Sequence, residues 1–440
     1  MQEILVRGGR PPHVPVSPEA SLARHGYGVF GGNVGNTLFL SSVFRQLNTA
    51  SHRAVVDSSY LERNRSEPKS LAAQINERFS AYAIPLANAF RPGWETSLSR
   101  LTEIIDHLTI PVVVVGVGVQ AGVGRVESIP SSVRDAATRF VEAVLDHSAS
   151  VGVRGELTAS FLHSCGFSSE EITVIGCPSL FNNPGDLQVM RRVSKILPDD
   201  PIAINMAPSA FSANLRVFNS MLRRYPNMIY VAQQFEELEM LLWGTDWTTK
   251  YPGLPLHTDH HMYEEDRIRF FLDPIRWAEF MRTRLFAFGS RIHGNIAAIS
   301  AGTPALVIAH DSRVSEIANY HRIPTIPSAR DLDDSIVDTL YELADYSEFN
   351  KQHPENFARY TQFLEANGLA HIYQPGQANP GYDKLLSEVD FPSGVGVVEA
   401  HLNFGGRELL RKLAWLRQGM GEDKKRWVGG YMPAFRPSGK

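Results

Sequence analysis

The chain has 440 residues, 43% of them hydrophobic and 20% charged, which is ordinary for a globular protein but too long for one hydrophobic core. Its formal net charge of −4 provides no global positive field for binding nucleic acid or an anionic membrane surface. The two cysteines, Cys165 and Cys177, lack the spacing of a disulfide scaffold or a zinc site, so we expect buried thiols in a reducing compartment.

Neither the N-terminal sequence nor the longest apolar run predicts a membrane segment. The first 20 residues contain no apolar signal core, and the apolar run IPVVVVGVGV at residues 110–119 has about half the length that a spanning helix needs. We therefore expect a soluble, cytoplasmic protein. The last 24 residues mix glycine, proline and basic side chains with little periodicity, which favours a mobile tail.

The first part of the chain alternates short apolar runs with amphipathic ones. A glycine-rich turn at residues 26–36 precedes TLFLSSVFRQL, whose apolar residues recur at helical spacing. Further strand-like runs follow at residues 81–90, 111–119, 150–154 and 171–180, with helix-like runs between them. This βαβ order predicts a doubly wound α/β domain with a parallel sheet.

A second series of the same kind follows a polar, proline-containing segment at residues 182–200. Its predicted strands are residues 202–208, 228–234, 285–289 and 304–309, separated by helix-like runs. The pattern then becomes almost wholly helical. We predict two Rossmann-like domains that face a cleft, over residues 1–185 and 199–330, and a helical extension with the mobile tail over residues 331–440.

An arginine and a histidine stand two positions apart directly after the strand-like run LFAFG. In SRIHGNIAAISAG, Arg291 and His293 begin a helix whose N-terminus favours an anion, and Arg291 adds a planar fork suited to carboxylate or phosphate. The alternative for His293 is a helix-start histidine that is satisfied by a backbone carbonyl. The residues alone leave both interpretations open.

The ordered set of motifs resembles the polysaccharide pyruvyl transferase family. SRIHGNIAAISAGTPALVIAHD is similar to the family's Arg-x-His-Gly helix start and Gly-x-Pro turn, and GNVGNTLFLSSV to its Gly-Asn-x-Gly-Asp loop. IPVVVVGVGVQA resembles its central strand, and VGVRGELTASFLHSCG its Val-Arg-x-x-x-Ser helix. The resemblance covers residues 27–320 in order and spacing.

This resemblance implies a fold like that of GT-B glycosyltransferases. It also implies transfer of pyruvate from phosphoenolpyruvate to two hydroxyls of a sugar, as a cyclic ketal, during synthesis of a cell-surface polysaccharide or exopolysaccharide. The acceptor would be a sugar or a lipid-linked oligosaccharide at the inner face of the cytoplasmic membrane, with no nucleic acid partner. Neither a cofactor nor a metal is implied, because phosphoenolpyruvate is a substrate.

The family's functional positions map onto particular residues here. Arg154 and Arg291 would each hold an anionic group of the donor, and His293 would act as general acid because an imidazolium can donate a proton near neutral pH. Further donor contacts would come from Gly294 and Arg313; acceptor or loop contacts would come from Gly32, Asn33, Gly35, Asn36, Asn88, Gly118 and His310.

Several of these residues also have plainer interpretations. Arg154 can form a salt bridge with Glu156, and the glycines can simply form a tight turn. Asp311 is expected to cap the helix that follows it rather than to act in catalysis.

The chain also departs from the family pattern at two positions. Asn36 stands where an aspartate is common, which removes a charge, and Asn88 lies where many relatives have a glycine run.

A histidine-rich segment at residues 257–261 raises the question of a metal site. The histidines at 257, 260 and 261 lack the spacing of two ligands on one helical face, so a solvated loop is favoured over a metal site.

Two other functions remain as alternatives. One rival function is a GT-B-type glycosyltransferase that uses a nucleotide sugar. The other is a non-catalytic carbohydrate-binding homologue, which would not need the histidine and both arginines.

Overall fold

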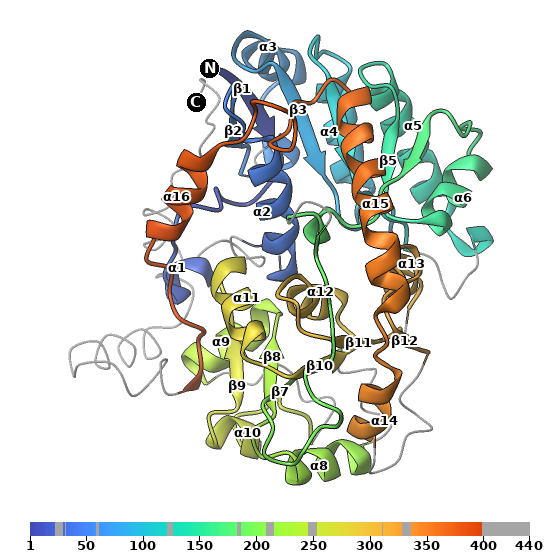
Figure 1. Cartoon of the computed structure of the whole chain (residues 1–440). Coiled ribbons are helices and arrows are strands. Elements are labelled where there is room, and N and C mark those ends of the chain that lie inside the picture. The colour runs from blue at the N-terminus through green and yellow to red at the C-terminus, as the bar shows by residue number, and fades with distance from the viewer. Residues whose placement is uncertain are drawn as a thin grey trace.

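The computed structural model describes residues 1–22, 30, 32–58, 61–120, 126–182, 186–207, 215–244, 253–309, 311–327 and 336–397. Two units with parallel sheets lie one above the other along the molecule (Figure 1). We call the unit with strands β1 to β6 the first unit, and the unit with strands β7 to β12 the second unit. The predicted fold class, two Rossmann-like α/β units, is thereby confirmed.

The first unit is built on a sheet of order β2–β1–β3–β4, in which every pair is parallel. Its strands are β1 (Gln2–Val6), β2 (His52–Val56), β3 (Ala81–Pro85) and β4 (Val112–Val115). The parallel pair β5 (Val151–Val153) and β6 (Ile172–Val174) continues it through a bridge between Val117 and Val153.

Helices cover both faces of this sheet, because successive strand residues point to opposite sides. One face packs against helices α3 (Pro68–Arg78), α4 (Glu95–Ile105), α5 (Ser131–Leu145) and α6 (Glu156–Ser164). The other face packs against α2 (Gly35–Leu47) and against the C-terminal helices described below. The four valines of β4 are fully buried, as their continuous β-branched run predicts.

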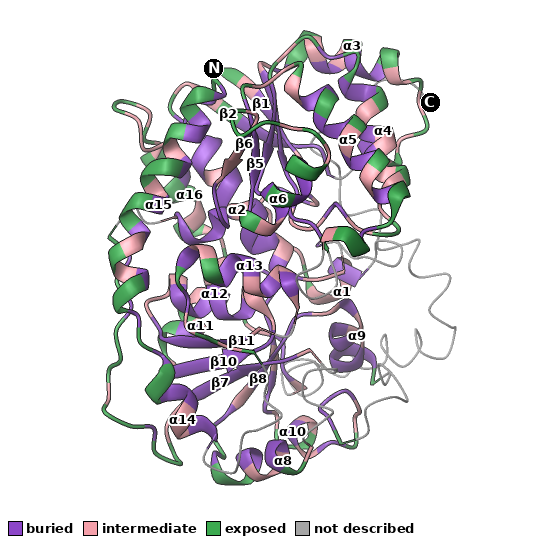
Figure 2. Cartoon of the chain, turned by 90° about the vertical axis from the view of Figure 1, so that its right-hand side faces the viewer, coloured by how far each residue is buried: buried purple, intermediate pink, exposed green. Residues whose placement is uncertain are grey.

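The second unit has a six-stranded parallel sheet of order β12–β11–β10–β7–β8–β9. The strands are β7 (Ile202–Asn205), β8 (Ile229–Ala232), β9 (Ile268–Phe270), β10 (Phe286–Gly289), β11 (Ala305–Ile308) and β12 (Thr325–Ile326). Its helices are α8 (Leu215–Arg224), α9 (Phe235–Trp243), α10 (His261–Glu264), α11 (Pro274–Arg282), α12 (Ile292–Ser300), α13 (Ser312–His321) and α14 (Ile336–Leu343). The short helix α1 (Pro18–Leu22) belongs to the first part of the chain but packs near α9 (Figure 2).

The last described helices return the chain to the first unit. Helix α15 (Ser347–Ala366) begins in the core of the second unit with Phe349 and continues past the first sheet, where Tyr360 and Phe363 are buried (Figure 1). Helix α16 (Pro380–Glu388) lies beside α2. We call residues 347–388 the C-terminal segment. The predicted domain boundaries at residues 185, 199 and 331 stay predictions, and the expected mobile tail lies outside the described residues.

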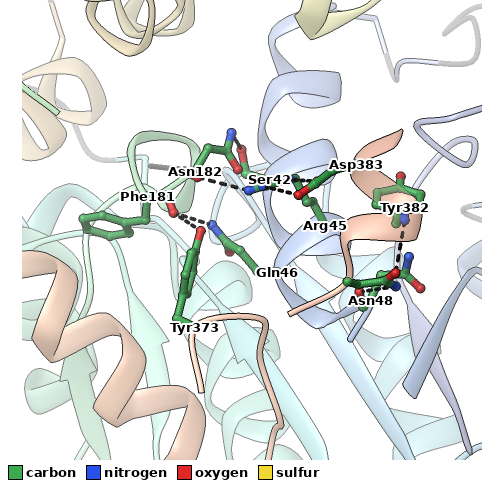
Figure 3. A network of polar contacts seen from close by, with 10 residues as sticks. Ser42, Arg45, Gln46, Asn48, Phe181, Asn182, Tyr373, Tyr382 and Asp383 are labelled. Carbon is green, nitrogen blue, oxygen red and sulfur yellow. Dashed lines mark hydrogen bonds and ion pairs between the residues drawn. The ribbon is translucent and has the colours of Figure 1, made fainter. Parts of the chain in front are cut away.

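A polar network joins this C-terminal segment to the end of α2 (Figure 3). Arg45 donates two hydrogen bonds to the Asp383 carboxylate, at 2.7 and 2.9 Å, and one to the Asn182 carbonyl at 3.0 Å. The amide of Gln46 donates to the Phe181 carbonyl at 3.2 Å. It also accepts from the Tyr360 hydroxyl at 2.6 Å. The network therefore connects three segments that are far apart in the sequence.

No helix within the described residues combines the length and the apolar character needed to cross a bilayer.

Candidate functional site

The candidate site lies where the start of α12 in the second unit meets the start of α2 in the first unit. On the second unit's side, Gly289 ends β10 with a φ of +149°, and a Cβ there would lie 1.5 Å from the Asn205 carbonyl oxygen. Only glycine permits this close approach. The Asn205 side chain accepts from the Arg291 N–H at 3.1 Å, and Asn295 donates to the Gly289 carbonyl at 3.0 Å. These buried amides fix the direction in which α12 leaves the sheet.

The glycine-rich loop of the first unit is bonded directly to the second unit. The Val34 N–H donates to the Gln233 carbonyl at 2.9 Å, and the Phe235 N–H donates to the Gly32 carbonyl at 3.0 Å. Asn33 and Gln234 pair as an antiparallel bridge. The loop that precedes α2 is therefore held against the end of β8 and the start of α9.

Within this loop, Gly35 is the point of contact with His293. A Cβ on Gly35 would lie 2.5 Å from His293 Nδ1 and 2.6 Å from His293 Cβ, so a side chain there would displace the imidazole. Asn33 accepts the Gly35 N–H at 2.8 Å, and the side chain of Asn36 donates to the Phe30 carbonyl at 3.0 Å. The asparagine at position 36 thus serves the shape of the loop in this structure.

His293 is placed as the helix start predicts, but its charge differs from the expectation. Its Nε2 is buried, and no hydrogen bond joins its ring to any described residue. Burial, assisted by the positive charge of Arg154, lowers the pKa of His293 to about 3. The imidazole is therefore neutral at neutral pH, whereas the sequence interpretation assumed an imidazolium.

Arg154 reaches the same place from the first unit, between β5 and α6. Its side chain lies against Gly118, where a Cβ would be 2.5 Å from Arg154 Cδ, and the residue is 5% exposed. Its Nε has no hydrogen-bond partner within the described residues. The alternative partner Glu156 is exposed, and no ion pair joins it to Arg154. Burial lowers the pKa of Arg154, and the nearby Cys177 and Glu316 oppose the shift.

Glu316 is a neighbour of Arg154 that the sequence interpretation missed. It projects from α13 of the second unit and accepts the Thr158 N–H at 2.6 Å, in the first turn of α6. Gly155 makes room for it, because a Cβ at that position would be 2.2 Å from Glu316 Cγ. Burial raises the pKa of Glu316. A carboxylate from one unit therefore caps a helix of the other beside the buried arginine.

Arg291 has a different environment from Arg154, because its guanidinium is bonded to protein acceptors. Its Nε donates to the Met206 carbonyl at 2.7 Å. With its amide oxygen facing Arg291, Gln234 accepts from Arg291 Nη2 at 3.1 Å and from Asn33 Nδ2 at 3.2 Å. Arg291 thus fastens the glycine-rich loop to the start of α12.

The remaining predicted residues have the following positions and hydrogen-bond partners. Arg313 forms an ion pair with Asp311 at 2.5 Å, and Asp311 also accepts the Val314 N–H at 3.0 Å, which confirms its predicted role as a helix cap. Asn88 follows β3 and donates to Gln120 at 3.2 Å. Gly294 is buried in the first turn of α12. His310 lies outside the described residues.

Two other places were candidates for a ligand. No cluster of three or more histidine, cysteine, aspartate or glutamate side chains suited to a metal occurs among the described residues; His260 instead caps α10 and stacks on His261. A polar cavity of about 750 Å³ lies at the amino ends of β8 and β9, away from α12. Its buried Arg267 is bonded to the Met228 and Tyr225 carbonyls, so this cavity offers no unpaired cation from that residue.

Comparisons with known proteins add one informative match. Residues 33–312 match the model of the family described as polysaccharide pyruvyl transferase. A search of curated proteins finds no match. Similar solved structures include the UDP complex of S. aureus MnaA, with 14% identity, a TM-score of 0.41 and coverage of 89% of this chain and 99% of that one. A Rickettsia bellii UDP-N-acetylglucosamine 2-epimerase has 11% identity, a TM-score of 0.44 and coverage of 83% and 96%. Such low values carry no argument about function.

Proposed function

The chain belongs to the polysaccharide pyruvyl transferase family, and on that premise we propose that it transfers pyruvate from phosphoenolpyruvate to two hydroxyls of a sugar as a cyclic ketal. One observation supports this function above the others. Arg154 from the first unit is buried, and His293 from the second is half-buried and close enough for the charge of Arg154 to lower its pKa; each has a buried nitrogen, Nε and Nε2 respectively, without a partner among the described residues. Buried hydrogen-bonding groups are normally satisfied, so a missing partner indicates a ligand.

Phosphoenolpyruvate suits these groups because it carries a carboxylate and a phosphate. Arg154 supplies a planar fork for one anionic group. The first turn of α12 has no side-chain cap on its N–H groups, and its partial positive charge favours a second anionic group there. Arg291 acts mainly as a positioning residue in this proposal, because its side chain holds the loop that brings Gly35 to His293.

The neutral state of His293 fits a proton transfer that begins only after the donor binds. Burial, assisted by the positive charge of Arg154, lowers the pKa of this imidazole, and a bound anion would offset that charge and raise the pKa. The protonated His293 then gives its proton to C3 of the enol, which becomes a methyl group and leaves C2 as an oxocarbenium-like centre.

Two additions complete the ketal. The first sugar hydroxyl adds to C2 and transfers its proton to His293, which is thereby protonated again. Phosphate then leaves as Arg154 and the helix N–H groups stabilise its charge, and the second hydroxyl adds to C2. The second hydroxyl's proton departs with the phosphate. The products are the cyclic ketal and inorganic phosphate, so atoms and charges balance without a further reactant.

The acceptor in this proposal is a sugar of a cell-surface polysaccharide, free or linked to a lipid carrier at the inner membrane face. In this proposal the acceptor binds on the side of the first unit, near Asn36 in the first turn of α2 and Asn88 in the loop after β3. The reaction then takes place in the cytoplasm, where phosphoenolpyruvate is available to such an enzyme.

Calorimetric titration tests the donor first. We expect phosphoenolpyruvate to bind the wild-type protein, and Arg154→Ala to weaken its affinity by at least about 100-fold because the fork is lost. Arg53→Ala is the matched control, since that arginine is exposed and paired with Glu3 in the first sheet. Binding of a UDP-sugar together with no binding of phosphoenolpyruvate would assign the protein to the glycosyltransferases instead.

The reaction itself is tested with a panel of glycosides that offer different hydroxyl pairs. Turnover should release inorganic phosphate and add one pyruvyl ketal to the acceptor, as seen by mass spectrometry. Phosphate release without a ketal on any acceptor would indicate hydrolysis, and would contradict the proposed transfer.

A further inference from the structure

Gln233 is a buried residue at the edge of the candidate site to which the proposed mechanism gives no role. It follows β8 at its carboxyl end and is 1% exposed. Its backbone N–H donates to the Glu237 carboxylate at 2.8 Å, and its carbonyl accepts the Val34 N–H from the first unit. Both backbone groups are therefore engaged, and the position of the backbone is fixed by both units.

The side-chain amide of Gln233 points toward the start of α12. A Cβ on Gly294 would lie 2.5 Å from Gln233 Nε2, so the amide nitrogen rests against the glycine that follows His293. This Nε2 is buried and has no hydrogen-bond partner within the described part of the chain. A buried N–H without a partner is destabilising, and native proteins retain such groups where a ligand or a function compensates.

Two other glutamines, the buried Gln46 and the half-buried Gln234, have hydrogen-bond partners for their side-chain amides. Gln46, fully buried at the far end of α2, uses its nitrogen on the Phe181 carbonyl and its oxygen on the Tyr360 hydroxyl. Gln234, the next residue after Gln233, uses its amide on Arg291 and Asn33. Asn64 also has an unpaired buried amide nitrogen, but that residue is half-buried, whereas Gln233 is 1% exposed.

We propose that the side-chain amide of Gln233 donates a hydrogen bond to an anionic oxygen of the bound donor, beside the first turn of α12. This inference rests on the proposed function and adds a third binding group to it. A neutral amide gives direction to the contact without adding a further positive charge next to His293. The same contact explains Gly294, since any side chain at that position would push the amide away from the helix start.

Gln233→Met tests the proposal because methionine keeps the length of the side chain but has no N–H. We expect the affinity for phosphoenolpyruvate to fall about tenfold by calorimetry, which corresponds to about 1.4 kcal/mol. The melting temperature should stay the same or rise, because an unpaired buried N–H is removed. Gln233→Glu, which has the same shape with a negative charge, should lose affinity by more than Gln233→Met.

Gln46→Met is the matched control, with the same chemical change at a fully paired amide. It should lower the melting temperature and leave the affinity for phosphoenolpyruvate within about twofold. Unchanged affinity in Gln233→Met and Gln233→Glu would overturn the inference, and so would a loss of melting temperature in Gln233→Met as large as in Gln46→Met.

Failure of the inference can be separated from failure of the proposed function. A wild-type protein that does not bind phosphoenolpyruvate contradicts the function and the inference together. A wild-type protein that binds it, with Gln233→Met equally tight, contradicts the inference alone. Titrations with inorganic phosphate and with pyruvate then identify the oxygen: the ligand whose affinity falls in Gln233→Met carries the group that the amide binds.

Discussion

Helix α2 has opposite kinds of polar surroundings at its two ends. At its C-terminal end, Arg45 and Gln46 have partners for their side-chain nitrogens on the C-terminal segment and on residues 181–182 (Figure 3). At its N-terminal end, in the candidate site, Arg154 and Gln233 are buried but keep unpaired N–H groups. The paired end fastens the C-terminal segment and residues 181–182 to the first unit, whereas the other end has the unpaired N–H groups on which the proposed function rests.

The largest expected difference between the two ends concerns turnover. His293→Ala should lower the rate of ketal formation by about 10² to 10⁴-fold, because the general acid is lost, while the affinity for phosphoenolpyruvate changes little. The measurement is phosphate release with the acceptor found by the glycoside panel. His371→Gln, in the C-terminal segment, is the control and should retain turnover. A His293→Ala protein with near wild-type turnover would remove the proton-donor role.

The next comparison pairs two buried or half-buried arginines. Arg154→Met should keep or raise the melting temperature, because an unpaired buried cation is replaced by an apolar side chain, although donor binding is lost. Arg45→Met should instead lower stability by about 1 kcal/mol, since its ion pair with Asp383 is partly exposed, and should keep donor binding. Thermal unfolding and calorimetry of both variants measure these effects. If both substitutions lower the melting temperature, or both abolish donor binding, the proposed difference between the two ends of α2 is wrong.

Part of the acid sensitivity should come from His321, which packs on Phe181 at the paired side. Burial, assisted by His353, lowers the pKa of His321 to about 3, and its Nε2 accepts the Cys177 N–H at 2.8 Å. The unfolded chain binds this proton below its ordinary pKa near 6.5, so stability is lost as the pH falls from about 6.5 toward 3.

The lowered pKa of His321 should therefore reduce the free energy of unfolding by about 2 kcal/mol when the pH falls from 7 to 5. His321→Gln has no such group, so denaturant unfolding at the two pH values should show a correspondingly smaller loss than wild type. An equal loss in both proteins would assign the acid sensitivity to other groups.

The smallest expected effect is at the contact between Gly35 and His293. Gly35→Ala places a Cβ against the imidazole, so turnover should fall about tenfold and stability by about 1 kcal/mol or more. Gly381→Ala in α16 is the control, because the nearest atom to its Cβ would be 3.6 Å away. Turnover of Gly35→Ala at the wild-type level would mean that the position of His293 is not set by this contact.

Much of the architecture could be predicted because buried parallel strands have a strong local pattern. The valines of β4 and the small residues of α12 indicate their elements without reference to the rest of the chain. Strands β1, β2, β9 and β12 were missed: β9 and β12 have only three and two residues, and the five-residue strands β1 and β2 each begin with two polar residues. Their identity depends on neighbours that are distant in the sequence.

The candidate site was predictable only where its residues begin a helix. Arg291 and His293 follow a strand and precede small residues, which is a local signal. Gln233 and Glu316 carry no such signal, because their importance comes from contacts with Gly294 and Thr158 in other elements. The low pKa of His293 could not be predicted from the local sequence either. It arises from burial and from Arg154, which stands 139 positions earlier in the chain (293 − 154).

The return of α15 to the first unit affects how the protein can be synthesised. The hydrogen bond between Gln46 and Tyr360 joins residues 314 positions apart. At a translation rate of about 5–20 residues per second, Tyr360 is made roughly 15–60 seconds after Gln46. During that time, the face of the first sheet that Tyr360 and Phe363 later cover stays open on the ribosome. The first unit thus cannot be completed as a separate domain during synthesis, and this nascent intermediate is the species most in need of a chaperone.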